Sequence, residues 1–175
     1  MAYTVESLEP GMVILCMSGK HGPFWGRFLD DAIAWSSGPF VHAAYVGDQH
    51  LIEQVAPVRT APLDKYAENG WAFHIDGMTP DKAQAMINWG MKRLGQHYGY
   101  RAILEDAALY DLHYWGALRD HPSYPVCSGF VERAARCGAG IAITEQPLPS
   151  PTSLAFSPRL IGPRPWAPGH GHTRG

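Results

Sequence analysis

Three side chains in this sequence have the chemical types of a cysteine-based catalytic site: Cys127, His42 and Glu53. A cysteine nucleophile needs a base beside the thiol and a third group that holds the imidazole in the right tautomer. Cys127 follows the extended approach Pro125-Val126, at a point where we expect a helix to begin. The unpaired N–H groups and positive dipole end of a helix start favour thiolate over thiol, so this cysteine is the candidate nucleophile.

His42 and Glu53 lie on two short apolar runs, Phe40–Val46 and Leu51–Val55, which are separated by the polar residues 47–50. Two such runs around a four-residue turn predict a β-hairpin. The candidate base and the candidate orienting group are therefore expected on neighbouring strands of one sheet.

The register of this hairpin decides whether the two polar side chains can meet. We assume that Val46 lies opposite Leu51 across the four-residue turn. Ala44 then pairs with Glu53, and His42 lies two residues further along its strand, on the same face. Diagonal neighbours lie about 7–8 Å apart at the backbone, a gap that an imidazole and a glutamate can bridge. The rest of the face is apolar, where lone polar groups are costly, so we expect these two to be partners.

The rest of the chain supplies further elements around this hairpin. Hydrophobic periodicity bounded by Gly, Pro and Ser predicts buried strands over Gly11–Met17 and Trp71–Ile75, and a short edge segment over Pro158–Ile161. The same signals predict helices over Phe24–Trp35, Pro62–Asn69, Tyr98–Leu112 and from Cys127 to near Cys137, with a last capped turn over Ser150–Leu154.

One helix has a clear start signal, because Thr79-Pro80-Asp81 combines a capping side chain, a first-turn proline and an acid. Gly95 is expected to end this helix. Apolar residues at helical spacing predict its buried stripe, which is Ala83, Met86, Ile87, Met91 and Leu94.

Length and composition place the chain among soluble globular proteins. It has 175 residues, of which 46% are hydrophobic and 17% charged, and we expect a single domain over residues 1–168 with a disordered tail over 169–175. The net charge of −2, with scattered Lys and Arg, argues against a nucleic-acid partner. No apolar run approaches the roughly 20 residues of a membrane span, and we expect no integral membrane segment. Residues 1–10 lack a secretory signal, so we expect a cytoplasmic protein or one delivered without a classical signal peptide.

The three cysteines, Cys16, Cys127 and Cys137, form no disulfide framework, and their odd number favours free thiols in a reducing compartment. Cys16 lies inside an apolar strand and is interpreted as core filling. A zinc site built from Cys127, Cys137 and two histidines is an alternative. The sequence contains no CxxC, HxxxH or similarly tight ligand pair, so we expect no metal and no cofactor.

The ordered set of these segments resembles the circularly permuted NlpC-type papain-like cysteine hydrolases. Within that family the chain looks like the YiiX-like group, which is related to the lecithin:retinol acyltransferase-like proteins. The resemblance spans residues 10 to about 160. The segments that carry it are Pro10–Leu15, Val41–Asp48, Leu51–Val55, Tyr98–Tyr100, Val126–Val131 and Ser150–Leu154.

The resemblance implies an α+β papain-like fold, in which a mostly antiparallel sheet packs against helices that include the Cys127 helix. It implies that Cys127 is the nucleophile, His42 the general base and Glu53 the residue that orients the imidazole. The permutation would explain why the histidine precedes the cysteine. The backbone N–H of Cys127, helped by Tyr124, is the candidate for stabilising the oxyanion.

The function expected from this resemblance is a cysteine hydrolase that cleaves an amide bond through a Cys127 thioester acyl-enzyme. Its substrates would be peptides or isopeptides, with cell-wall peptides among them, and a phage-encoded protein would need no signal peptide of its own. An acyltransferase or thioesterase that uses an acyl lipid and the same triad is the alternative within this chemistry. A catalytically silent binding module and a metal-stabilised structural domain are the alternatives of other classes. Oligomeric state is left open by the sequence.

Overall fold

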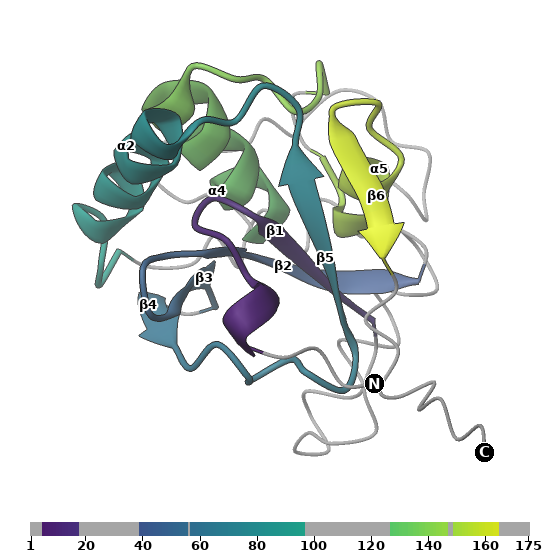
Figure 1. The fold of residues 1–175 in the computed structure, drawn as a ribbon, viewed down its shortest axis with the longest axis horizontal. Coiled ribbons are helices and arrows are strands. Elements are labelled where there is room, and N and C mark those ends of the chain that lie inside the picture. The colour runs from purple at the N-terminus through teal and green to yellow at the C-terminus, as the bar shows by residue number, and fades with distance from the viewer. Residues whose placement is uncertain (1–4, 18–38, 56, 97–126, 147–148, 165–175) are drawn as a thin grey trace, which may run out of the picture.

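The computed structural model describes residues 5–17, 39–55, 57–96, 127–146 and 149–164 (Figure 1). Several sequence predictions lie outside these residues. They are the helices over Phe24–Trp35 and Tyr98–Leu112, the oxyanion candidate Tyr124 and the tail over residues 169–175.

The described strands form one six-stranded sheet in the order β4-β3-β2-β1-β5-β6, and every neighbouring pair is antiparallel. Three successive strands, β2, β3 and β4, run side by side to one edge, whereas β1 joins them to β5 and β6. With the helices below, this sheet confirms the α+β class. The strands are β1 (Val13–Met17), β2 (Phe40–Val46), β3 (Leu51–Gln54), β4 (Val58–Ala61), β5 (Gly70–Ile75) and β6 (Leu160–Arg164).

Two of the described helices start at the predicted caps. The Thr79 hydroxyl accepts a hydrogen bond from the Lys82 N–H at 3.4 Å, and the Ser150 hydroxyl accepts one from the Ser153 N–H at 3.0 Å. The α4 helix begins at Cys127, as expected, and continues into a π-helical segment. The helical elements are η1 (Val5–Ser7), α2 (Pro80–Met91), α4 (Cys127–Arg133), the π-helical η2 (Ala134–Ala139) and α5 (Pro151–Ala155).

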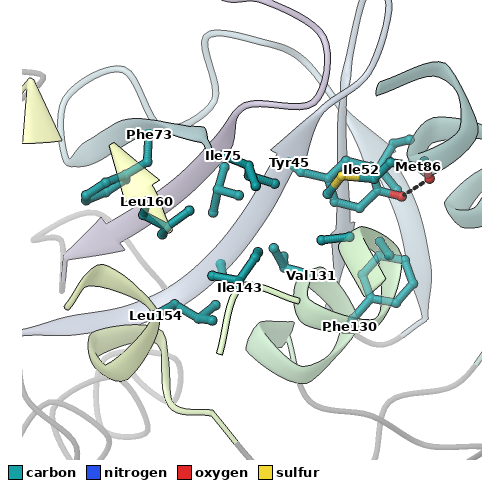
Figure 2. Close-up of a cluster of buried hydrophobic side chains, with 14 of the residues drawn as sticks. Tyr45, Ile52, Phe73, Ile75, Met86, Phe130, Val131, Ile143, Leu154 and Leu160 are labelled. Carbon is teal, nitrogen blue, oxygen red and sulfur yellow. Dashed lines mark hydrogen bonds between the residues drawn. The ribbon is translucent and has the colours of Figure 1, made fainter. Parts of the chain in front are cut away.

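The main core lies between one face of the sheet and the helices α2, α4 and α5 (Figure 2). Phe130 and Val131 of α4 project from the Cys127 helix into this layer, and both are fully buried. The Tyr45 hydroxyl, the polar end of a buried ring, donates a hydrogen bond to the Met86 carbonyl at 3.4 Å. This packing fixes α4 against β2 and thereby fixes where the Cys127 end of the helix lies.

A second apolar cluster covers the opposite face of the sheet. Its buried members come from β1 to β4 and from Met12 just before β1, and they include Ile14, Cys16 and Leu51. The N-terminal segment and the stretch between β4 and β5 contribute partly buried side chains over it, among them Leu8 and Tyr66. Cys16 is 1% exposed and packs within this cluster, which agrees with its interpretation as core filling.

The predicted helix over Pro62–Asn69 is wrong. These residues form consecutive turns, in which Lys65 N–H bonds to the Pro62 carbonyl and Ala67 N–H bonds to the Asp64 carbonyl. Their hydrogen bonds join residues three apart, and the chain enters β5 directly afterwards. The segment follows the surface of the sheet rather than winding away from it, because two of its side chains reach a buried carboxylate described below.

The helix α2 ends at Met91, three residues before the end of its predicted stripe, and Met91 and Leu94 are exposed rather than buried. The reason is a strand that the sequence analysis missed, β4. The Gly95 N–H bonds to the Val58 carbonyl, and the Val58 N–H bonds to the Gln96 carbonyl. These two bonds draw the chain out of the helix and onto the sheet edge. No helix among the described residues is long and apolar enough to cross a membrane.

Candidate active site

The β2–β3 hairpin has the register that its turn length predicts. Val46 pairs with Leu51, and Ala44 pairs with Glu53. His42 lies beyond the paired residues, and its Nε2 lies 3.2 Å from Glu53 Oε2. The structure therefore brings these two candidate residues into hydrogen-bond contact, as the diagonal register predicts.

A β-bulge lies in β2 directly beside His42. Cys16 of β1 pairs with His42, but the next residue, Met17, pairs with Phe40, so Val41 is an extra residue in β2. A bulge bends its strand and changes the direction in which nearby side chains point. This irregularity lies at the position where a side chain of β2 has to meet the start of α4.

The Cys127 side chain meets His42 at the start of α4. Cys127 is 5% exposed, and its side chain is hydrogen-bonded to the imidazole. Because His42 Nε2 faces Glu53, the other ring nitrogen, Nδ1, is the one left to face the sulfur. The backbone N–H groups of Ala43 and Ser128 also donate to this sulfur. The Cys127 sulfur thus lies among donors that favour its anionic form.

The pKa values of the cysteine and the histidine move in opposite directions. Burial would lower the pKa of His42, but its contacts with Cys127 and Glu53 outweigh burial and raise the pKa from 6.5 to about 9. Burial would raise the pKa of the Cys127 thiol, but the hydrogen bond and charge of His42 and the two backbone N–H groups lower it. A thiolate–imidazolium pair is therefore favoured around neutral pH.

Glu53 is completely buried and is held by four side chains. Its Oε1 accepts hydrogen bonds from Arg59 Nε at 2.8 Å and Lys65 Nζ at 2.5 Å. Its Oε2 accepts one from the Tyr66 hydroxyl at 2.5 Å and contacts His42. Two of the donors are cations, and they are partly exposed: the Arg59 side chain is 50% exposed and the Lys65 side chain 28%.

These donors keep the carboxylate of Glu53 ionised. Burial would raise the pKa of Glu53, but His42, Lys65 and Tyr66 outweigh burial and hold this pKa far below its ordinary value. The pKa of Tyr66 is raised by its own burial and by the negative charge of Glu53, so its hydroxyl stays a donor. Glu53 is therefore a fixed anion beside the imidazole.

Arg59, Lys65 and Tyr66 are residues of the candidate site that are not predicted from the sequence. Arg59 stands directly opposite Glu53 in the β3–β4 ladder, and the short run Val58–Ala61 after β3 has no apolar-polar alternation that would mark it as a strand. Lys65 and Tyr66 lie on the turns between β4 and β5, and no local sequence pattern predicts their contact with Glu53. The apolar spacing over Pro62–Asn69 predicts a helix there instead.

Comparison with known proteins gives a match at the level of structure. No protein-family model matches the sequence, and a search of curated proteins gives no match. The fold is similar to the crystal structure of metalloprotein yiiX from Escherichia coli O157:H7, DUF1105. The TM-score is 0.65 at 14% sequence identity, over 87% of this chain and 94% of that chain. The likeness shows a YiiX-like fold for this chain.

The side chains described here do not fit a metal centre. The described part of the chain contains no group of three or more His, Cys, Asp or Glu residues that could hold a metal ion. Glu53 already accepts from two cations, Arg59 and Lys65, which would compete with a metal for its oxygens. Of the cysteines considered for zinc, Cys127 begins α4 and is buried, whereas Cys137 lies exposed in η2.

Proposed function

We propose that this protein is a cysteine hydrolase of amide bonds, in which Cys127 is the nucleophile, His42 the general acid and base, and Glu53 the orienting residue. The observation that carries the proposal is the continuous contact from Cys127 through His42 to Glu53, with a lowered thiol pKa and a raised imidazole pKa. Catalysis by a cysteine nucleophile uses a base beside the thiol and a third group that orients the base, and these three side chains lie in contact in that order.

In the proposed reaction, the Cys127 sulfur attacks the carbonyl carbon of the amide and forms a C–S bond. The C–N bond then breaks, and the imidazolium of His42 gives its proton to the leaving amine. The products of this half are a free amine, a thioester on Cys127 and a neutral imidazole. The imidazole next takes a proton from water, whose oxygen attacks the thioester. The carboxylic acid leaves, and the thiolate–imidazolium pair is restored.

Glu53 has a separate role in this scheme. Its carboxylate accepts from His42 Nε2, so the imidazole keeps Nδ1 directed at the sulfur and its positive charge is stabilised. Because the pKa of Glu53 is held far below its ordinary value, the carboxylate does not take the proton itself. The N–H groups that already point at the Cys127 sulfur, from Ala43 and Ser128, are part of the electrostatic environment in which the thiolate attacks.

We assign the chain, within this proposal, to the circularly permuted NlpC-type papain-like hydrolases and to a single domain over residues 1–168. The chain order supports the permutation, because the histidine strand β2 precedes the cysteine helix α4. One sheet contains both β1 and β6, the first and last described strands, which supports a single domain.

The thiolate can be tested without a known substrate by alkylation with iodoacetamide at pH 6, followed by mass spectrometry of each cysteine peptide. Cys127 should react at least about tenfold faster than Cys137, although Cys137 is exposed, because a thiolate and not a thiol is the nucleophile. His42→Ala should remove most of this selectivity. Equal rates at Cys127 and Cys137 in the unmodified protein would overturn the proposal.

The reaction class is tested by turnover of murein peptides, isopeptides, acyl thioesters and phospholipids, each with Cys127→Ala as the blank. Release of an amine from the peptides or isopeptides supports the amide hydrolase. Turnover of thioesters or phospholipids alone would replace it with the acyltransferase or thioesterase alternative. A reactive Cys127 with no turnover on any member of the panel would favour the binding module.

A further inference from the structure

The turns between β4 and β5 bring two side chains onto the orienting carboxylate. Lys65 donates to Glu53 Oε1 and Tyr66 donates to Glu53 Oε2. The Tyr66 ring also lies against the His42 ring, with centroids 5.4 Å apart and planes tilted by 50°. The Lys65 ammonium in turn lies 4.8 Å from the centroid of the Tyr66 ring. One short segment therefore contacts both the carboxylate and the imidazole.

The geometry points to residues 62–70 as a positioning element of the proposed active site, in which Lys65 and Tyr66 hold the Glu53 carboxylate ionised and directed at His42. This inference rests on the proposed function and deepens it. Lys65 and Tyr66 are positioning residues, since they act on Glu53 and His42 and not on the thiol or the substrate.

The number of donors explains how the carboxylate is fixed. An ionised carboxylate offers about four lone-pair positions, and Glu53 meets four donors, two at each oxygen. With His42 and Arg59 alone, each oxygen of Glu53 would have one donor, and the carboxylate could still rotate. Lys65 and Tyr66 fill the remaining two positions, so Oε2 keeps a single direction towards the imidazole.

Gly70, at the start of β5, allows the chain to pass close to Tyr66. A side-chain Cβ at Gly70 would lie 2.7 Å from the Tyr66 carbonyl oxygen and 3.1 Å from the Tyr66 Cβ, closer than ordinary packing allows. The Gly70 N–H also bonds to that carbonyl at 2.7 Å. The absence of a side chain at Gly70 is what lets Tyr66 lie this close to β5 and reach Glu53.

The charges around Glu53 give this element a measurable signature. Among the described residues, the ionisable groups that contact Glu53 are His42 from β2, Arg59 from β4, and Lys65 and Tyr66 from the turns. Cys16 of β1 acts on Tyr66, and Cys127 acts through His42. Removal of Lys65 and Tyr66 takes away a cation and a donor but leaves the burial that disfavours the charged carboxylate. Glu53 would then take up a proton in a weakly acidic solution and would no longer fix the His42 ring. The hydrogen bond of the imidazole to the Cys127 sulfur would weaken, and the pKa of the thiol would rise.

The test is the pH profile of Cys127 alkylation by iodoacetamide, from pH 4 to pH 8, in the Lys65→Met, Tyr66→Phe and doubly substituted proteins. The quantity compared is the ratio of the rate at pH 7 to the rate at pH 4.5. We expect this ratio to be about tenfold larger in the double variant than in the unmodified protein. A tenfold change corresponds to a rise of about one unit in the pKa of the Cys127 thiol. Each single variant should give a smaller increase.

Three controls separate positioning from general damage. Lys65→Arg keeps a cationic donor and should restore the original profile. Lys82→Met removes an exposed lysine of α2 that bonds to the Gly77 carbonyl, and it should leave the profile unchanged. Gly70→Ala displaces Tyr66 without removing a polar group, and it should reproduce the Tyr66→Phe profile.

The outcomes distinguish this inference from the proposed function. An unmodified protein in which Cys127 titrates as an ordinary thiol would overturn the proposed function, and the positioning role with it. A low-pKa Cys127 whose pH 7 to pH 4.5 ratio is the same in the double variant would overturn only the positioning role. Should the double variant not fold, Lys65→Met decides alone, because its side chain is partly exposed; an unchanged ratio there contradicts the role of Lys65.

Discussion

Glu53 and Glu132 are both buried glutamates, 0% and 5% exposed, yet the pKa of the first is lowered and that of the second is raised. Glu132 is well supplied with donors. Arg136 contacts its Oε1 through Nε at 2.9 Å and Nη2 at 2.8 Å. The backbone N–H groups of Ile143 and Thr144 donate to its Oε2 at 3.0 Å and 3.2 Å.

The difference lies in the kind of donor and not in the number of bonds. Glu53 faces Arg59, Lys65 and a protonated His42, whose charges together exceed its own. Glu132 faces the guanidinium of Arg136, which is 45% exposed, and two neutral amides, so burial outweighs them. Burial of a carboxylate is thus no mark of a functional group. An excess of cationic donors that includes an imidazole is the distinguishing feature of the proposed site.

The largest contrast is expected in the reactivity of Cys127. Glu53→Gln removes the anion that holds the imidazolium in place, so the contact of His42 with the Cys127 sulfur should weaken. Alkylation of Cys127 at pH 6 should then slow by up to about tenfold, through a rise of about one unit in the pKa of the thiol. The effect should be milder than that of His42→Ala, which removes the base itself. Glu132→Gln, the matched control in a second buried carboxylate, should change the rate by less than about twofold. Rates that fall equally in both variants would show that the loss reflects general destabilisation and would remove the distinction.

The half of the site on the hairpin could be predicted from sequence. A turn of four residues and the period of two along a strand fix which side chains share a face, so His42 and Glu53 follow from spacing alone. The relation between His42 and Glu53 is local, and few residues separate the partners. Arg59 stands opposite Glu53 one strand further on, but the run Val58–Ala61 lacks the alternation that would mark that strand.

The other half depends on packing between distant segments. Cys127 reaches His42 because Phe130 and Val131 bury against the sheet, and no spacing rule relates residues this far apart. Tyr66 reaches Glu53 through the path of the turns and the close contact at Gly70, which a helical pattern over the same residues conceals. From sequence, the family resemblance is what relates Cys127 to the hairpin.

A second contrast is expected in the pH dependence of stability. The pKa of Glu53 is lower in the folded chain than its ordinary 4.5, so the unfolded chain binds more protons below pH 4.5. Stability from this group is present above pH 4.5 and is lost as the pH falls below it, by up to about 1.4 kcal/mol per pH unit. Glu132 has a raised folded pKa, so its contribution falls as the pH rises above 4.5.

The two signs can be measured by urea unfolding between pH 3 and pH 7, as the difference between the unmodified protein and each variant. The free energy of unfolding of the unmodified protein minus that of Glu53→Gln should increase with pH up to about 4.5 and then stay level. The same difference for Glu132→Gln should decrease as the pH rises above 4.5. Differences of the same sign would mean that the two carboxylates have similar environments.

The smallest contrast concerns the two half-exposed arginines, Arg59 and Arg136. Arg136 is the cation that contacts Glu132, and its Nη2 also donates to the Thr144 carbonyl at 2.6 Å. Arg136→Met should therefore cost about 1 kcal/mol at pH 7, near the upper end for exposed pairs. Arg59→Met should cost less than about 0.5 kcal/mol, because Lys65 donates to the same oxygen of Glu53 and retains a cation there. Urea midpoints at pH 7 measure both. If Arg59→Met costs as much as Arg136→Met, Lys65 does not replace it. Both cations would then be needed to keep the pKa of Glu53 low, and neither could be removed without destabilising the buried carboxylate.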